Sequence, residues 1–514
     1  MENQGDDETR IHGTARRRRL ALFPLPLQGH LNPMLQLAGI LHSRGFSVAI
    51  IHTRFNSPLK SNYPHFTFHP IADGLSESQV STTAAADLLK MLQVQDTCAS
   101  GLRDCLGELL MSEEPVACLI VDSWWLSSKS VADSFGLPRM VLRTGSVTSF
   151  LGFSALVLLQ ENGYLQESQP EEAVPELPPL QIRDLPKFRP HDSQGLYPLI
   201  AAMIEQFKTS SGIIWNSFEE LEPPSMTKFR RDFPVPSFPV GPFHKYFPAS
   251  SSSLLPQDQS CISWLDTQPP KSVLYVSFGS IATMDEGQFL EMAWGLESSA
   301  QPFLWVVRPG LVGGWEWPGP LPSGFMERTG GRGHVVKWAP QQEVLGHGAI
   351  GGFWTHSGWN STMESICEGV PMMCSPFFGD QMTNARYVKD VWRIGLVVEP
   401  DEMKRGEVEE TIRRLMAEKE GEDMRERALW LKEKVELSLS QGCFSTQFHG
   451  IKQKWFLRKM NNLLAVALTK VITISRQCGS LLIPTSGKHI NHLEKMVYLC
   501  QMYALYKLKM TLQT

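Results

Sequence analysis

Residues 354–364, with the sequence WTHSGWNSTME, bring several side chains that can bind an anion into one short turn. The preceding residues AIGGFWT (349–355) are apolar and predict a buried strand that leads into this turn. Where a strand passes into a helix, free backbone N–H groups attract negative charge, and His356 and Asn360 add side-chain donors. We therefore predict that the turn holds a phosphate group, although a histidine in a turn can instead be solvated or cap the helix.

The helix after this turn has recognisable start and stop signals. Ser361 and Glu364 have the spacing of a capping box, so the helix is expected to begin at Ser361. Gly369 and Pro371 are expected to end it. The capping role alone would be enough to explain Glu364.

A second turn in the same half has the same design. Gly279 and Ser280 follow the apolar segment SVLYVSF, and Thr283 with Glu286 predicts another capping box at the next helix. Two turns suited to anions in one half favour a ligand with a diphosphate.

The first half contributes a histidine and a carboxylate. His30 lies in LQGHLNP between a predicted strand and a helix, in which Asn32 is expected to cap and Pro33 to take the first helical position. Asp122 ends the apolar segment VACLIVD. In open parallel sheets the carboxyl ends of the strands line the ligand crevice, so both side chains are expected there. Asp122 could equally cap the next helix.

Short apolar segments alternate with helical ones along most of the chain, which is typical of parallel α/β sheets. In the first half we expect strands at 20–26, 46–51, 116–122, 137–142 and 212–216. In the second half we expect them at 271–278, 302–307, 333–338, 349–355, 370–376 and 394–398. Residues 241–260 are rich in Pro and Ser without periodicity and predict a linker. Two α/β domains that face each other are therefore expected.

The composition is that of a globular protein and excludes several classes of partner. Hydrophobic residues make up 42% of the 514 residues, and the net charge of −5 gives no reason to expect nucleic acid. Nine cysteines without a CxxC pair argue against a disulfide framework and a zinc site, and they indicate a reducing compartment. We find no secretion signal, and the apolar stretch from Asn462 is too short for a membrane span. A cytoplasmic protein without stable membrane insertion is expected.

One segment formally matches the dinucleotide fingerprint G-x-G-x-x-G. GHGAIG (346–351) has three glycines at that spacing. The fingerprint must follow a strand and open a helix, whereas these glycines lead into a predicted strand. The match therefore does not support a nicotinamide-dependent oxidoreductase.

Residues 338–381 carry a dense match to a known family. Their sequence, WAPQQEVLGHGAIGGFWTHSGWNSTMESICEGVPMMCSPFFGDQ, resembles the signature box of plant UDP-sugar-dependent glycosyltransferases that act on small molecules. PLQGHLNPMLQLA, LRTGSVTSF and VLYVSFGS also resemble family segments, so the similarity extends over residues 17–442. The sequence resembles the branch that includes steviol and cytokinin glucosyltransferases.

This resemblance implies the GT-B fold, with two Rossmann-like α/β domains facing each other across a cleft. The acceptor would bind to the first domain and the donor to the second. The implied boundaries are a polar N-terminal extension at 1–16, an acceptor domain at 17–240, the linker at 241–260, a UDP-sugar domain at 261–442 and an atypical basic tail at 443–514.

The resemblance also implies which residues bind the donor. They are Trp338, Ala339 and Gln341 at the base and ribose, Glu364 at the ribose hydroxyls, Ser280, His356, Asn360 and Ser361 at the diphosphate, and Trp359, Asp380, Gln381 and Thr144 at the sugar. Gln381 looks like the residue that the family uses for glucose, so UDP-glucose is the implied donor. On sequence alone the two tryptophans could instead be core residues.

The residue types fit the chemistry of such a transfer. An acceptor hydroxyl is a poor nucleophile near neutral pH, and His30 is the candidate base that takes its proton. Asp122 would hold the imidazole in the right tautomer and stabilise the imidazolium. Helix ends and His356 could stabilise the departing UDP, so neither a metal ion nor a cofactor is expected. The implied protein is an inverting, monomeric enzyme of plant secondary metabolism that acts on a small hydrophobic metabolite or hormone.

Two residues and the tail depart from the family pattern. Ser357 stands where a cysteine is usual, at a position expected to pack, and Gly145 stands where a serine is frequent on the acceptor side. Residues 443–514 contain ten Lys and Arg against one Glu and have no family match, which looks like altered splicing or a gene-model error. The alternative function is therefore a catalytically weak relative that binds UDP-sugar and metabolite, with domain closure impaired by this tail. Intact His30 and Asp122 argue against it.

Overall fold

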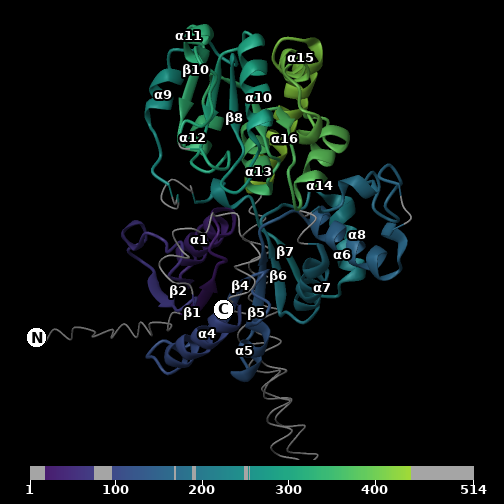
Figure 1. Cartoon of the computed structure of the whole chain (residues 1–514). Helices are drawn as coiled ribbons and strands as arrows, with labels where there is room; N and C mark the ends of the chain where they lie inside the picture. The colour runs from purple at the N-terminus through teal and green to yellow at the C-terminus, as the bar shows by residue number, and fades with distance from the viewer. Residues whose placement is uncertain are drawn as a thin grey trace, which may run out of the picture. The chain divides into compact units, whose positions relative to one another are not determined.

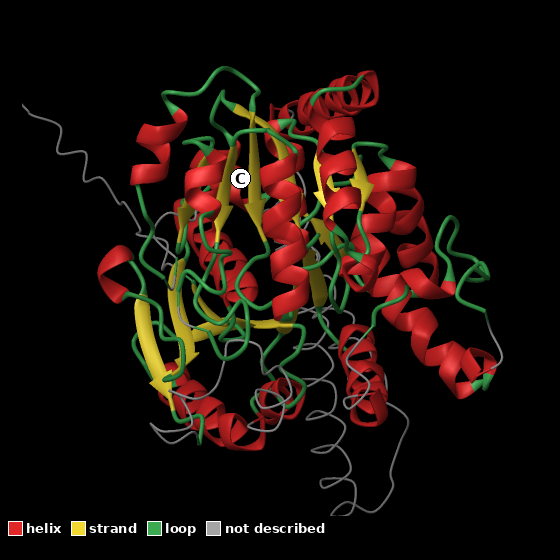
Figure 2. Ribbon diagram, turned by 45° about the horizontal axis from the view of Figure 1, so that its top comes forward, coloured by secondary structure: helices red, strands yellow, loops and turns green. Residues whose placement is uncertain are grey.

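The computed structural model describes residues 18–74, 95–166, 169–187, 193–247, 253, 255–315 and 317–440. These residues form two sheets, each with its own helices, within one compact unit (Figure 1, Figure 2). The predicted α/β class with two Rossmann-like sheets is confirmed. No described helix is long and apolar enough to cross a bilayer. The expected N-terminal extension at 1–16 and the tail at 443–514 lie outside the described residues.

The first sheet is parallel, with seven strands in the order β3-β2-β1-β4-β5-β6-β7. In its middle, Leu20 of β1 is level with Val48 on one side and with Cys118 on the other. The strands are β1 (Arg19–Phe23), β2 (Ser47–Thr53), β3 (Thr67–Ile71), β4 (Val116–Asp122), β5 (Arg139–Arg143), β6 (Gly212–Trp215) and β7 (Ser237–Pro239). The helices are α1 (Gln28–Ser43), α4 (Gln95–Leu110), α5 (Ser128–Ser134), α6 (Val147–Glu161), α7 (Ser193–Lys208) and α8 (Pro223–Asp232).

The second sheet is also parallel, with six strands in the order β10-β9-β8-β11-β12-β13. The strands are β8 (Val273–Ser277), β9 (Phe303–Val306), β10 (Gly333–Val336), β11 (Ile350–Thr355), β12 (Met372–Cys374) and β13 (Gly395–Val397). The helices are α9 (Ser260–Leu265), α10 (Glu286–Ser298), α11 (Phe325–Thr329), α12 (Gln341–Leu345), α13 (Trp359–Glu368), α14 (Gln381–Arg386), α15 (Arg405–Met416) and α16 (Lys419–Ser440). α16 packs against α13 and α15 of the same half.

All strands expected from the apolar segments are present, within a few residues of their expected bounds. The sequence patterns do not predict the edge strands β3 and β7. β3 has one buried residue, Ile71, and contains Pro70, and β7 has three residues and ends at Pro239. Proline is tolerated at a sheet edge because one side of the strand needs no N–H donor, so the usual strand signals are weak there.

Two helices begin at residues other than those predicted. α1 begins at Gln28, because the Leu27 carbonyl already accepts the N–H groups of residues 30 and 31, so Asn32 and Pro33 lie inside the helix. α10 begins at Glu286, and its capping box pairs Asp285 with Gln288 instead of the predicted residues 283 and 286. Residue 284 is held in a bridge to residue 312, which prevents an earlier helix start.

The first part of the segment predicted as a linker is packed against the first half. Phe243 is fully buried, and its backbone N–H donates to Oδ1 of Asn216 at 3.0 Å. The Phe247 ring crosses α1 at Gly39, where a Cβ atom would lie 2.7 Å from the ring. Glycine at this position therefore allows the chain to leave the first half close to α1.

The glycines of GHGAIG serve strand packing. A Cβ atom on Gly351, in β11, would collide with the carbonyl oxygen of Lys271, and the pairing of β11 with β8 shifts register at this glycine. Gly348 is exposed, and a Cβ atom there would meet nothing within 4 Å. Glycine is needed at position 351 because two backbones approach closely there, and not because the segment binds a phosphate.

We expect Gly351→Ala to lower the free energy of unfolding by about 2–3 kcal/mol, the cost of overpacking a close contact. Gly348→Ala is the matched control, because neither glycine has a positive φ and only the space around the Cβ atom differs. Thermal unfolding of both variants checks this. Equal melting temperatures would contradict the packing role.

Candidate active site

A cavity of about 650 Å³ lies where the carboxyl ends of the two sheets meet. Residues that follow β1, β5, β8, β10, β11 and β12 line it, as expected for parallel α/β sheets. The predicted site residues that line it are His30, Thr144, Ser280, Trp338, Ala339, Gln341, His356, Trp359, Asn360, Ser361, Glu364, Asp380 and Gln381. Asp122 is fully buried behind His30.

His30 and Asp122 form a hydrogen-bonded pair at this cavity. Nδ1 of His30 lies 2.7 Å from Oδ2 of Asp122, and Oγ1 of Thr144 lies 3.2 Å from the same nitrogen. The other carboxylate oxygen accepts the backbone N–H of Trp124 at 3.0 Å, which fixes the carboxylate. A carboxylate can only accept, so His30 donates from Nδ1 and keeps Nε2 as a proton acceptor. His30 lies in the first turn of α1, whereas the sequence placed it before the helix.

Helix α13 begins at Trp359 with Gly358 as its N-cap, so the predicted start at Ser361 is wrong. Ser361 and Glu364 are used by α12 instead: both accept from Nε2 of Gln341, at 3.0 and 2.6 Å. Gly358 has no side chain with which to cap the helix. The N–H groups of the first turn therefore lack partners within the helix and can bind an anion, as the turn sequence predicts.

His356 lies beside this helix end as a neutral imidazole. Burial and, to a smaller extent, the charge of Arg308 lower the pKa of His356 to about 4. The ring packs against two glycines: a Cβ atom on Gly279 would lie 2.6 Å from it, and one on Gly358 would collide with its Nε2. Gly279 also has a φ of 66°, which favours glycine. His356 can therefore offer an oxyanion a hydrogen bond but no positive charge near neutral pH.

The residues expected at the nucleobase and ribose of UDP are held in place by side-chain hydrogen bonds. Gln341 and Gln342 donate to the two carboxylate oxygens of Glu364 at 2.6 and 2.8 Å. Burial raises the pKa of Glu364 above its usual value, and these two hydrogen bonds offset part of the rise. The indole N–H of Trp338 donates to the Ser253 hydroxyl at 2.9 Å, which fixes the ring. The sequence patterns do not single out Gln342, because nothing in them shows which residue fixes Glu364.

Asp380 and Gln381 lie after β12, at the end of the cavity assigned to the sugar. The Gln381 side-chain oxygen accepts the backbone N–H groups of residues 377 and 378 at 2.8 and 3.1 Å, which leaves its NH₂ group for a ligand. Asp380 accepts from Nδ2 of Asn384 at 3.3 Å. Burial raises the pKa of Asp380 above its usual value, and the nearby charge of Arg143 offsets part of the rise.

Three hydrogen bonds join the start of α13 to the first half. The Trp359 indole N–H donates to the Asn216 carbonyl at 2.8 Å, and the Asn360 amide donates to the Gly29 carbonyl at 2.7 Å. The Asn216 amide in turn donates to Oδ1 of Asn360 at 3.4 Å. Both side chains were predicted to bind the donor. In this structure their side-chain N–H groups donate to the first half, and their backbone N–H groups lie in the first turn of α13.

The two departures from the family pattern differ in their surroundings. Ser357 is fully buried, has a left-handed φ of 62° and does not line the cavity, as expected for a packing position. Gly145 does line the cavity, and a Cβ atom there would lie 3.1 Å from Oδ2 of Asp380 and 3.4 Å from Nε of Arg143. Glycine therefore keeps open the space between a carboxylate and a guanidinium, which a serine side chain would enter.

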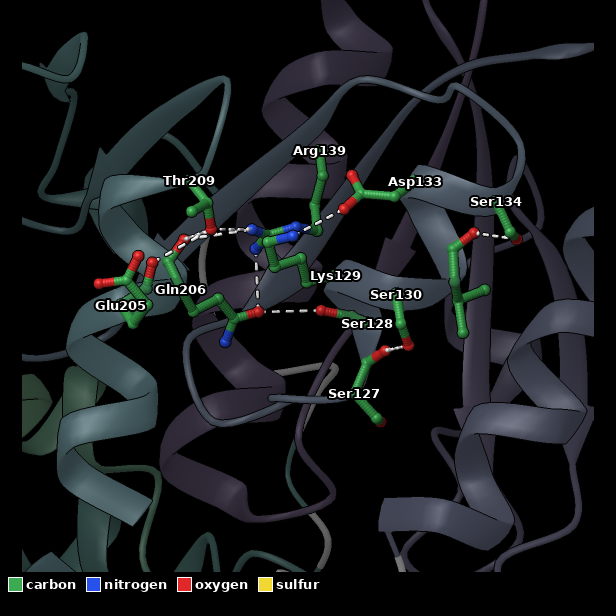
Figure 3. A network of polar contacts seen from close by, with 11 residues as sticks. Ser127, Ser128, Lys129, Ser130, Asp133, Ser134, Arg139, Glu205, Gln206 and Thr209 are labelled. Carbon is green, nitrogen blue, oxygen red and sulfur yellow. Dashed lines mark hydrogen bonds and ion pairs between the residues drawn. The ribbon is translucent and has the colours of Figure 1, made fainter. Parts of the chain in front are cut away.

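Arg143, at the end of β5, is a buried cation that the sequence patterns do not single out. Its Nη1 donates to the Ser123 hydroxyl at 3.3 Å, and its Nε has no hydrogen-bond partner within the described part of the chain. Arg139, at the start of the same strand, is better satisfied, since it donates to the side chain and the carbonyl of Gln206 at 2.9 and 3.1 Å (Figure 3). Because buried polar groups normally find partners, Arg143 stands out beside the cavity. An arginine at the carboxyl end of a buried strand is the signal that could have revealed it.

Comparison with known proteins agrees with this geometry. The family model described as UDP-glucoronosyl and UDP-glucosyl transferase matches residues 226–432. UDP-glycosyltransferase 76B1 of Arabidopsis thaliana is 49% identical over 451 residues, which cover 87% of this chain and 97% of the relative. UDP-glycosyltransferase 76G1 of Stevia rebaudiana is 49% identical over 452 residues, covering 86% and 96%. The chain belongs to the UDP-glycosyltransferase family.

Solved structures of glycosyltransferases share the fold of this UDP-glycosyltransferase. Phytolacca americana UGT2 complexed with UDP-2fluoro-glucose and pterostilbene has a TM-score of 0.73 and 29% identity, over 85% of this chain and 99% of that chain. UDP-glucose: anthocyanidin 3-O-glucosyltransferase in complex with UDP has a TM-score of 0.74 and 27% identity, over 85% and 99%. The expected GT-B fold is thereby confirmed. The family and these structures identify the chain as an enzyme with UDP-glucosyltransferase function.

In this UDP-glycosyltransferase, we expect Gly279→Ala to weaken UDP binding about tenfold, or ~1.4 kcal/mol, because the new Cβ atom would displace the His356 ring. Isothermal titration calorimetry with UDP measures the effect. Gly314→Ala is the matched control, since Gly314 has a φ of 80° and its Cβ atom would meet nothing within 4 Å. The same loss of affinity in both variants would mean that backbone strain, and not the histidine, is responsible.

Proposed function

We propose that the enzyme transfers glucose from UDP-glucose to a hydroxyl group, or another nucleophile, of a small hydrophobic plant metabolite or hormone. The product would be a β-glucoside, formed with inversion. The observation that carries this proposal is the His30–Asp122 pair in a cavity that also contains the open end of α13. One half supplies a base for the acceptor and the other an anion site for the departing UDP.

In the proposed step, Nε2 of His30 takes the proton of the acceptor hydroxyl as the acceptor oxygen bonds to the anomeric carbon. The bond between that carbon and UDP breaks at the same time. Asp122 accepts the Nδ1–H of His30 and stabilises the imidazolium that forms. The acceptor enters opposite the leaving group, so a single displacement inverts the anomeric centre.

The proposed donor site follows the roles implied by the family. Trp338, Ala339 and Gln341 contact the base and ribose, Glu364 the ribose hydroxyls, Ser280, His356, Asn360 and Ser361 the diphosphate, and Trp359, Asp380, Gln381 and Thr144 the sugar. Asn360 contributes through its backbone N–H in the first turn of α13, because its side-chain amide already bonds to Gly29. Gln381 contributes through its free NH₂ group.

We propose that no metal ion or other cofactor takes part. The first turn of α13 offers backbone N–H donors, and neutral His356 adds a side-chain donor, so the charge that develops on UDP meets several hydrogen bonds at once. These donors belong to the chain itself and need no bridging cation.

The proposed acceptor site lies beside Thr144. Trp124 and Phe153 line the cavity there, and their aromatic rings fit a hydrophobic acceptor. The Arg143 guanidinium lies 5.9 Å from the first ring centre and 5.1 Å from the second. Variable segments at about 73–95 and 144–205 are proposed to shape the choice of acceptor, and they lie partly outside the described residues.

We also propose a cytoplasmic monomer. Both walls of the cavity come from one chain, so the site needs no second subunit. Six cysteines among the described residues are free thiols, which fits a reducing compartment. The alternative, a weakly catalytic binding protein, is not favoured because the His30–Asp122 pair is assembled. The tail at 443–514, to which impaired closure was attributed, lies outside the described residues.

The proposed function is tested by incubating the protein with UDP-glucose, EDTA and a panel of small hydrophobic hydroxy compounds, followed by mass spectrometry. A product heavier than the acceptor by one glucosyl residue, which is glucose less one water, is expected in the presence of the chelator. UDP-galactose in competition should be used less well. Transfer that needs added Mg²⁺ or Mn²⁺ would overturn the metal-free mechanism, and a preference for galactose would overturn the donor assignment.

We expect His30→Ala to lower kcat by about 10²–10⁴-fold, the range typical for loss of a general base, with UDP affinity unchanged. Asp122→Asn should also lower kcat, because an amide cannot stabilise the imidazolium. His347→Ala is the matched control, since His347 lies 3.2 Å from Asp266 in an exposed His–Asp pair outside the cavity. A His30→Ala enzyme as active as the control would rule out His30 as the base.

A further inference from the structure

Pro33 lies inside α1, where a proline is costly. It is the sixth residue of the helix and is buried. In an α-helix the N–H of residue 33 would bond to the carbonyl of Gly29, but proline has no N–H. Its ring also crowds the carbonyl four residues earlier and pushes it away from the helix axis. The Gly29 carbonyl is therefore deprived of its usual partner within the helix.

The second half supplies the missing donor. The side-chain amide of Asn360, in the first turn of α13, donates to the Gly29 carbonyl at 2.7 Å. Asn216 holds this amide from the other side, since it donates to Oδ1 of Asn360 at 3.4 Å. The amide is thus oriented so that its NH₂ group faces α1.

The position of this bond matters for the reaction. Gly29 directly precedes His30, and Asn360 lies in the helix turn to which the diphosphate is assigned. A hydrogen bond between them fixes the distance from the base to the donor-binding turn. Displacement reactions depend steeply on such distances.

We infer that Pro33 is a positioning residue: by withholding its N–H from Gly29, it reserves that carbonyl for Asn360 and so sets His30 against the donor-binding turn. This inference rests on the proposed function, because it assumes that His30 is the base. Pro33 touches neither substrate, and it acts through Gly29 and Asn360.

The test uses five forms of the full chain: the unchanged protein, Pro33→Ala, Asn360→Ala, the double variant and Pro198→Ala. Pro198 lies inside α7 with an exposed side chain and does not line the cavity, so it is the matched control for removing a helix proline. For each we would measure kcat, the Kd of UDP and the melting temperature.

Pro33→Ala should lower kcat about tenfold, the equivalent of one hydrogen bond, while the Kd of UDP stays the same. Its melting temperature should not fall, because the introduced alanine favours a helix and has an N–H that can donate to the Gly29 carbonyl. If Pro33 had a merely structural role, Pro33→Ala would lower both kcat and the melting temperature. The double variant should be no slower than Asn360→Ala, since both substitutions break the same bond, and Pro198→Ala should keep the original kcat.

Melting temperatures give a readout that needs no turnover. In the Asn360→Ala background the Gly29 carbonyl has lost its partner, so Pro33→Ala should raise the melting temperature more there than in the unchanged protein. Additive effects of the two substitutions on both kcat and melting temperature would overturn the inference. Coupled melting temperatures in a protein that transfers no sugar would instead overturn the proposed function and leave the hydrogen bond established.

Discussion

The hydrogen bond from the Asn360 amide to the Gly29 carbonyl, 2.7 Å long, is the contact between the two halves that lies nearest to His30 in the chain. Among the described residues the two sheets share no strand, so contacts between side chains and loops hold His30 and the start of α13 opposite each other. This bond acts one residue away from His30 and within the first turn of α13. The bond contributes about 1 kcal/mol of net free energy, so its main effect is to fix the direction and distance between the two residues. Trp359, bonded to the Asn216 carbonyl at 2.8 Å, supports the same alignment.

Electrostatics within the cavity keep the histidine at the start of α13 uncharged. His356 is neutral near pH 7 because burial lowers its pKa to about 4. The buried cation Arg143 lies near Asp380, at the sugar end, and its charge partly offsets the cost of burying that carboxylate.

The sequence predicts the strands well because a strand buried in a parallel sheet is a continuous apolar run, as in VACLIVD. The helix starts are predicted less well. Ser361 and Glu364 have capping-box spacing, yet Gln341 takes both side chains, and the helix begins two residues earlier. A local pattern cannot show that a side chain from another helix will compete for the same oxygens.

The same limit applies to the cavity. The types of residue that line it follow from the motifs, and His30 lines the crevice as the sequence predicts, although it lies in the first turn of α1. The motifs do not predict which residues form hydrogen bonds with these side chains. The matched segments contain Gln342 and Arg143 but give them no role, and the contact between Asn360 and Gly29 joins residues that are far apart in the chain. Such pairings exist only after both sheets have formed.

If Pro33 reserves the Gly29 carbonyl for Asn360, it also favours the form in which the two halves are in contact. An ordinary residue in its place would satisfy the Gly29 carbonyl whether the cleft is open or shut, and the open form would lose nothing. With proline, the carbonyl finds its protein partner only when the halves are together, so the population of closed molecules rises. The bias of one hydrogen bond is small, about fivefold in the closed-to-open ratio, because water replaces the amide when the cleft opens. So small a bias would favour closure and still allow the cleft to reopen.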